Sequence, residues 1–212
     1  MTGKFSIVNH PNKKQERKKA MEAFVRQGML DAVISLLMRD GVQGITMDRV
    51  ATEAGVAKGT LYAYFKNKEE ILEAAIEASF EPLILELTRK MDADKAPDER
   101  LADFSRHNLQ FFDEKQDLVR VLFYDRERTD SGKNHFNDSR YLGLLNKVAG
   151  VLSEGVSTGL FVPLNPMKVA SMFIEANMGM VMQRIRDEVS GDIEEDAKQI
   201  TDIFIKGLRN NQ

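Results

Sequence analysis

Apolar residues recur along this chain with the 3.6-residue period of an α-helix, and no segment alternates between apolar and polar residues as a β-strand does. The first stripe contains Leu30, Val33, Ile34 and Leu37 and ends near Asp40-Gly41, where glycine favours helix termination. Further stripes predict helices at about 47–54, 58–65, 68–90, 98–114, 116–126, 141–156, 167–188 and 193–208. The pattern therefore predicts an all-α protein of nine helices.

Residues that favour helix ends support these boundaries. Thr46, Asn67 and Asn165 each precede a predicted helix, and each can accept a hydrogen bond from a backbone N–H of the first turn. Pro166 suits the first position of a helix. Pro82 lies inside the helix at 68–90, which we expect it to kink.

Composition limits the chemistry that this chain can perform. Its 212 residues contain no Cys and only 3 His, which excludes disulfides, thiolate metal sites and thiol nucleophiles and argues against a His-rich metal site. The longest stretch without a charged residue, 155–167, is too short for a membrane span. The first residues show no apolar signal core, and the absence of Cys fits a reducing cytosol, so we expect a cytoplasmic protein.

The net charge of −3 hides an uneven distribution. Residues 1–70 carry an excess of positive charge, whereas the rest of the chain is acidic. A basic run precedes the first apolar stripe and consists of Lys13, Lys14, Arg17, Lys18 and Lys19. Such a run is either a contact for a polyanion or a solvated helix face, and the sequence leaves both readings open.

The two short helices at 47–54 and 58–65 are joined by a turn at Gly55, which is the spacing of a helix-turn-helix. In the second helix, AKGTLYAYF, Leu61 and Phe65 are spaced to anchor it to a core. The residues left facing outward are Lys58, Gly59, Thr60, Tyr62 and Tyr64. Hydroxyls and ammonium groups at this density suit contacts to phosphate oxygens, although the Tyr62 ring can also pack partly against its own domain.

The stretch GITMDRVATEAGVAKGTLYAYFKNKEEIL resembles the N-terminal signature of the tetracycline-repressor (TetR) family of bacterial transcription regulators, over about residues 28–75. The resemblance implies a homodimer on a palindromic operator, with a three-helix DNA-binding head and a six-helix body that binds an effector and dimerises. It divides the chain into a basic N-terminal arm or helix extension (1–22), a DNA-binding domain (23–75, with the helix-turn-helix at 46–65) and an effector-binding and dimerisation domain (76–212).

The resemblance also assigns roles to residues of the head. Thr46 would cap the first helix of the motif and contact a phosphate, and Lys58, Gly59 and Thr60 would enter the major groove. Tyr62 and Tyr64 would hold the DNA backbone, and Lys68 would meet a phosphate. The arm residues Lys13, Lys14 and Lys18 are further candidates. Ala57 departs from the Ser or Thr that many members carry before the recognition helix.

For the body, the resemblance implies a small, often hydrophobic effector among the central helices. Asn108 and Asn177 are polar residues on otherwise apolar helix faces, and each requires a hydrogen-bond partner. The candidate effector-binding residues are Phe104, Asn108, Phe111, Phe123, Tyr124, Tyr141, Phe173 and Asn177, and at helical spacing such aromatic residues are mostly ordinary core. His107 and Asp103 have metal-ligand spacing, but the periodicity assigns both to a polar face, so we expect no metal and no cofactor.

The last two helices, 167–208, have apolar residues to spare, which either close the core of the monomer or form a dimer interface. The resemblance favours the dimer. A non-DNA-binding carrier or adaptor is the alternative function, and an enzyme is disfavoured because the chain has no Cys nucleophile, no Gly-rich phosphate loop and only scattered His. The expected partners are an operator DNA duplex, a small-molecule effector and a second copy of the chain, with no membrane.

Overall fold

The computed structural model describes residues 13–128, 138–186 and 191–210, together with the side chains of these residues outside 123–140. Over these ranges the chain forms nine α-helices, one short 3₁₀-helix and no β-strand, so the all-α prediction is confirmed. The helices are α1 (Lys13–Asp40), η1 (Val42–Gly44), α2 (Met47–Glu53), α3 (Lys58–Tyr64), α4 (Lys68–Met91), α5 (Pro97–Glu114), α6 (Gln116–Arg128), α7 (Asp138–Ser157), α8 (Pro166–Ile185) and α9 (Ile193–Leu208).

The helix starts that the sequence predicts are held by side-chain caps. Thr46 Oγ1 accepts a hydrogen bond from the Arg49 N–H at 3.3 Å, and Asn67 Oδ1 accepts one from the Glu70 N–H at 2.8 Å. Asn165 Oδ1 caps α8 in the same way. Ala57 provides no side-chain cap for α3, as its methyl group requires.

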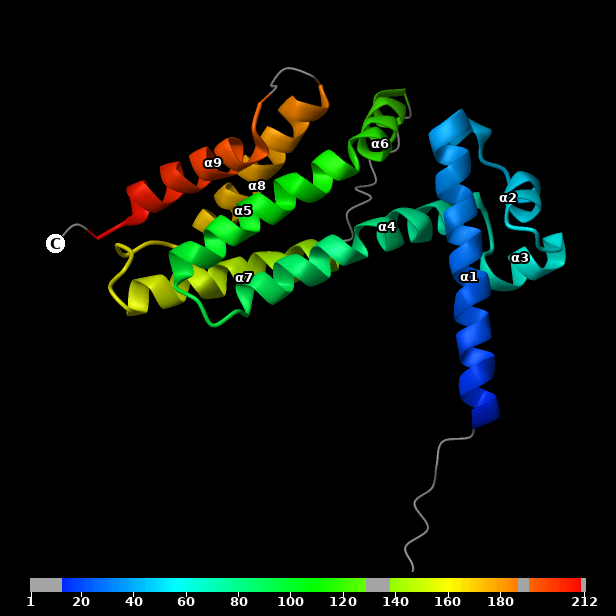
Figure 1. The fold of residues 1–212 in the computed structure, drawn as a ribbon, viewed down its shortest axis with the longest axis horizontal. Coiled ribbons are helices and arrows are strands. Elements are labelled where there is room, and N and C mark those ends of the chain that lie inside the picture. Colours follow the sequence, from blue (N-terminus) through cyan, green and yellow to red (C-terminus); the bar gives the residue numbers. More distant parts are fainter. Residues whose placement is uncertain (1–12, 129–137, 187–190, 211–212) are drawn as a thin grey trace, which may run out of the picture. The chain divides into compact units, whose positions relative to one another are not determined.

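The chain divides into two compact units, Met1–Ala75 and Ile76–Gln212. In unit 1 the second half of α1 supplies most of the core, through Met29, Leu30, Val33, Leu36 and Leu37, which are at most 1% exposed. Residues 13–28 of the same helix are exposed apart from a half-buried Val25, so α1 runs well past the core that it serves (Figure 1). We call residues 13–28 the α1 extension.

In unit 2, α5 packs against α7, α8 and α9 (Figure 1). The rings of Phe104 on α5 and Phe173 on α8 have centroids 5.3 Å apart, and Phe173 contacts Phe204 of α9 at the same separation. Arg100 at the other side of α5 donates to Glu154 of α7. The core of unit 2 is therefore built around α5.

One interpretation of the sequence is wrong in this unit. The periodicity assigns Asp103 to a polar face, but only 4% of this residue is exposed. Burial alone would raise the pKa of its carboxyl group; the hydrogen bond from Lys95 and the charge of Arg106 outweigh that effect, and the pKa is lowered. His107 contacts the Asp103 backbone carbonyl through Nδ1 at 2.7 Å, and no group of side chains in the described ranges is arranged to hold a metal ion.

None of the helices in the described part of the chain combines the length and the apolar character that crossing a membrane requires.

Candidate nucleic-acid interface

The helix-turn-helix is formed by α2 and α3, and its buried residues are those that the sequence indicates. Leu61 and Phe65 anchor α3, at 0% and 3% exposure, and Val50 and Ala51 anchor α2. Gly55 between the helices has φ +66°, a backbone conformation that side chains with a Cβ rarely adopt. The angle between α2 and α3 is therefore determined locally, by the two pairs of buried anchor residues and by Gly55.

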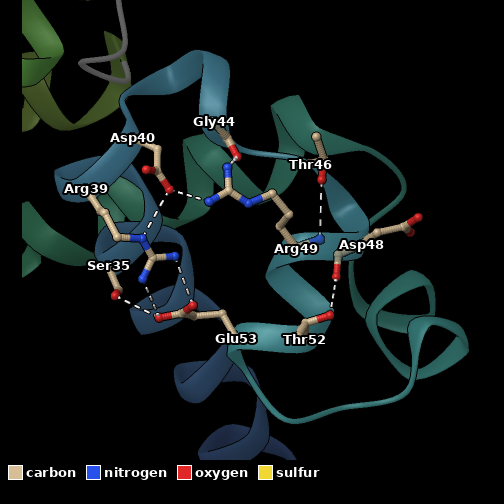
Figure 2. Close-up of polar contacts among 9 residues, drawn as sticks. All are labelled: Ser35, Arg39, Asp40, Gly44, Thr46, Asp48, Arg49, Thr52 and Glu53. Carbon is tan, nitrogen blue, oxygen red and sulfur yellow. Dashed lines mark hydrogen bonds and ion pairs between the residues drawn. The ribbon is translucent and has the colours of Figure 1, made fainter.

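A polar cluster of α1, η1 and α2, which we call the α1–α2 clamp, holds α2 against α1 (Figure 2). Arg39 of α1 binds Glu53 at 3.2 Å, and Ser35 donates to the same carboxylate at 3.0 Å. Arg49 of α2 binds Asp40 and donates to the Gly44 carbonyl at 2.7 Å. Sequence reasoning missed this cluster, because its partners lie 9 and 14 residues apart and no local pattern connects them.

The clamp carboxylates are held in their charged form. Hydrogen bonds from Arg49 and then Arg39 lower the pKa of Asp40, and those from Arg39 and Ser35 lower the pKa of Glu53. The two arginines of the clamp are therefore engaged within unit 1, and the cations that α3 and the α1 extension offer lie outside this cluster.

The α3 residues predicted to contact DNA lie at the surface. Lys58, Gly59 and Thr60 are exposed, Tyr62 is 47% exposed, and Tyr64 is half-buried. Lys58 Nζ lies 2.5 Å from Asp48 Oδ1 of α2, and this hydrogen bond raises the pKa of the lysine. α3 thus presents a surface of small, hydroxyl-bearing and cationic groups, with one tyrosine turned partly toward its own unit.

Two other residues that are predicted to contact DNA also form hydrogen bonds within the protein. The Thr46 hydroxyl oxygen caps α2 and remains exposed, so its O–H can still donate outward. The Lys68 ammonium donates to the Val42 carbonyl at 2.7 Å, which fixes the first turn of α4 to η1. An ammonium group has three donors, so this bond leaves Lys68 able to bind a phosphate.

The basic run forms the first turns of α1. Lys13, Lys14 and Lys18 are exposed on the α1 extension, and Lys18 lies 3.8 Å from Glu22, one turn away. Two large apolar side chains, Met21 and Phe24, are exposed on the same segment, at 63% and 76%. Sequence reasoning missed these two apolar side chains, because they stand among charges and belong to no stripe.

The candidate effector residues separate into several groups. Phe104 and Asn108 of α5 and Phe173 and Asn177 of α8 are all buried. Phe111 is half-buried and packs on Phe80 and Phe112. The Tyr141 hydroxyl binds Glu175 at 3.2 Å on an exposed part of α8, and the side chains of Phe123 and Tyr124 lie outside the described residues.

A small cavity opens between α5 and α8, and no sequence pattern indicates it. Its apolar walls are Leu109, Phe112, Val181 and Ile185, and Asp113 and Arg184 stand at its polar rim. Arg184 binds Asp113 at 3.2 Å and Asp196 at 2.5 Å, so these ion pairs at the rim link α9 to α5 and α8.

Comparison with known proteins gives consistent results. Residues 29–75 match the family described as bacterial regulatory proteins, tetR family. The fatty acid metabolism regulator protein of Bacillus subtilis is 23% identical over 201 residues, which cover 93% of this chain and 99% of that protein.

Two solved structures share the fold. The fatty acid degradation regulator FadR of Bacillus halodurans superposes with a TM-score of 0.71 at 20% identity, over 88% of this chain and 97% of that one. The complex of SmeT, a repressor from Stenotrophomonas maltophilia, with triclosan gives 0.68 at 21% identity, over 88% and 92%.

Proposed function

The chain belongs to the TetR family of bacterial regulatory proteins, and from this premise we propose that it is a homodimeric repressor that leaves a palindromic operator when it binds a small apolar ligand. The observation that carries the proposal is the α3 surface, where exposed Lys58, Gly59 and Thr60 stand on the buried anchors Leu61 and Phe65. Such a protein acts where DNA is, in the bacterial cytoplasm.

On DNA, α3 enters the major groove with Lys58, Gly59 and Thr60, while Tyr62 and Tyr64 contact the backbone. Thr46 and Lys68 bind phosphates at the two ends of the motif, the first through an exposed hydroxyl and the second through the remaining donors of a half-buried ammonium group. Lys13, Lys14 and Lys18 of the α1 extension bind flanking phosphates, an interaction favoured by their exposure and by the excess of cations over Glu16 and Glu22 in this segment.

The second copy binds through α8 and α9. Met172 and Ile203 are 62% and 67% exposed on these helices, and Gly179 and Gly207 are exposed nearby in sequence. Large apolar side chains beside glycines suit a close helix-to-helix contact. Two heads joined in this way reach half-sites about 34 Å apart, one turn of the duplex.

The ligand binds among the helices of unit 2. Relatives named for fatty acid metabolism and a relative bound to triclosan favour an apolar compound. The buried set Phe104, Asn108, Phe173 and Asn177 and the cavity beside it supply the residues for such a guest. Phe111, Phe123, Tyr124 and Tyr141 remain further candidates.

The test is selection of duplexes from random-sequence DNA by the full-length protein, followed by sedimentation of the complex. The proposal expects an inverted repeat with half-site centres about one turn apart, bound by two chains. Recovery of random sequences, with binding that disappears at moderate salt, would instead favour the alternative of a carrier or adaptor without operator recognition.

A further inference from the structure

Asn108 of α5 and Asn177 of α8 stand at the same level of one helix–helix contact. The Phe104 and Phe173 rings meet at 5.3 Å, and farther along both helices Arg184 binds Asp113. The two helices therefore run in the same direction. Each asparagine lies four residues, about one turn, after its phenylalanine.

Both amides are buried, and each has an unused hydrogen-bonding atom. Asn108 is 4% exposed and its Nδ2 has no acceptor; Asn177 is 1% exposed and its Oδ1 has no donor. The Nδ2 of Asn177 is satisfied by the Phe173 carbonyl at 2.9 Å. A buried polar atom without a hydrogen-bond partner destabilises the fold, so each of these two atoms requires a partner.

The two unused atoms are complementary, since one is a donor and the other an acceptor. Along α5 and α8 the two asparagines follow the Phe104–Phe173 ring pair and precede Leu109, Phe112 and Val181, which wall the small cavity. We call this part of the α5–α8 contact, from the ring pair to the cavity, the amide seam.

Each arginine of α5 and α8 binds a carboxylate of this chain, Arg106 through Asp103, and the Nε–H of Arg100 and of Arg184 is buried without a partner. Arg100 binds Glu154 and the Met91 carbonyl, and Arg184 binds Asp113 and Asp196. A carboxylate placed between the two asparagines would lose its hydration, and it cannot donate to the Asn177 Oδ1.

We propose that the amide seam binds the effector and that the effector is a neutral, largely apolar alcohol or phenol. Its hydroxyl oxygen accepts from Asn108 Nδ2, its O–H donates to Asn177 Oδ1, and its apolar part extends along α5 and α8 towards the small cavity, which the guest has to widen. This inference rests on the proposed function of a ligand-controlled repressor, and it assigns the chemical class of the ligand.

The experiment compares matched probes on the full-length protein by calorimetry: 1-octanol, 1-decanol and 4-hexylphenol against octanoate and decanoate. At least one hydroxyl compound is expected to bind about tenfold or more tightly than the carboxylate of equal chain length. In ¹⁵N-labelled protein, the side-chain NH₂ signals of both asparagines should shift along the same titration.

Variants separate a ligand contact from a structural role. Asn108→Leu and Asn177→Leu should each weaken binding of the best hydroxyl probe about five- to tenfold. Thr201→Val, which removes a buried hydroxyl bonded to the Ala197 carbonyl on α9, should leave this affinity unchanged.

Equal affinity for the alcohol and the carboxylate, or no binding of any hydroxyl probe, would overturn the inference. Asparagine NH₂ signals that do not shift in the wild-type protein would also overturn it. Leucine variants that both keep full affinity for the probe but have a lower Tm would overturn it as well, because that result indicates a structural role. Failure of the proposed function is a separate result, because it appears in the duplex selection with unliganded wild-type protein.

Discussion

The guanidinium carbon of Arg26 lies 5.3 Å from the centroid of the Phe65 ring, so the base of the α1 extension is tied to the end of α3. A cation over an aromatic ring contributes about 0.5–1 kcal/mol where it is exposed to water. Phe65 is buried and anchors α3, so its ring is held in place. The helix from Arg26 back to Lys13 projects about 20 Å from this point.

The first prediction concerns the charges of that extension. Substituting Lys13, Lys14 and Lys18 together by Gln should make the plot of log affinity against log salt shallower, by about one unit for each phosphate that is no longer bound. Preference among operator variants should stay the same, because phosphate contacts carry no base identity. Fluorescence anisotropy at several salt concentrations measures both quantities.

The matched control is the triple substitution of Lys115, Lys147 and Lys198 by Gln, which removes the same charge from unit 2. A slope that changes equally in the two triple variants would assign the effect to net charge, and an unchanged slope in the first would make the extension a solvated helix.

The second prediction concerns the α3 surface. Lys58→Ala and Tyr62→Ala should each weaken operator binding by about 1–3 kcal/mol, because each removes a group exposed on α3. Thermal unfolding should change little, since Leu61 and Phe65 keep α3 anchored. Lys115→Ala serves as the control. Full affinity in both α3 variants would remove these residues from the interface.

Features determined within one or two helical turns could be predicted from the sequence. The caps by Thr46, Asn67 and Asn165 join residues three apart, and the Leu61–Phe65 anchor joins residues four apart. The burial of Asn108 and Asn177 was also indicated, since each interrupts an apolar face. In each case the determining contact is local.

Features that depend on contacts between residues distant in sequence could not be predicted. The bond from Lys68 to the Val42 carbonyl spans 26 residues, and that of Arg49 to Asp40 crosses from one helix to another. Asp103 is buried although the periodicity assigns it to the surface, because its neutralising partner Lys95 stands before α5, outside the helical periodicity.

The third prediction concerns packing in unit 2. A Cβ on Gly155 of α7 would collide with the ring of Phe161, which is 1% exposed and cannot easily move. Gly155→Ala should therefore destabilise the protein by about 1–3 kcal/mol.

Gly150, one and a half turns earlier on the same helix, has open space around a built Cβ. Gly150→Ala should stabilise by about 0.5–1 kcal/mol, because alanine loses less backbone entropy in a helix. Urea unfolding of both variants measures the difference, and effects of the same sign would contradict the close packing of Phe161 on Gly155.

The fourth prediction concerns acid sensitivity. The hydrogen bond from Arg89 lowers the pKa of Glu86 from 4.5 to about 2. The folded protein thus favours the charged carboxylate, and this stabilisation is complete above pH 4.5 and disappears as the pH falls toward 2. Both side chains are partly exposed, so the contribution stays below about 1 kcal/mol.

Glu86→Gln should therefore lower the free energy of unfolding at about pH 7 and approach the wild type near pH 2. Denaturation at about pH 7, 4.5 and 2.5 reveals the difference, and Glu73→Gln, at an exposed site on the same helix, controls for loss of one negative charge. Parallel pH curves for wild type and Glu86→Gln would show that the Arg89 bond does not survive in solution.

The fifth prediction joins the dimer to DNA affinity. Ile203→Asp and Met172→Asp each put a carboxylate on the exposed apolar surface of α8 and α9. In a two-fold symmetric interface the change enters twice, and burying unpaired carboxylates costs several kcal/mol. The dimer dissociation constant should rise about 100-fold or more, which sedimentation equilibrium measures.

Operator affinity should fall with the dimer, because a single chain binds only one half-site, whereas affinity for an isolated half-site should remain. Leu85→Asp is the control: it carries the same change at a side chain 61% exposed on α4, outside α8 and α9, and should leave both dimer and operator binding intact. If Ile203→Asp and Met172→Asp stay dimeric, these side chains do not form the interface. If they become monomeric with full operator affinity, one chain suffices for recognition and the palindromic operator loses its basis.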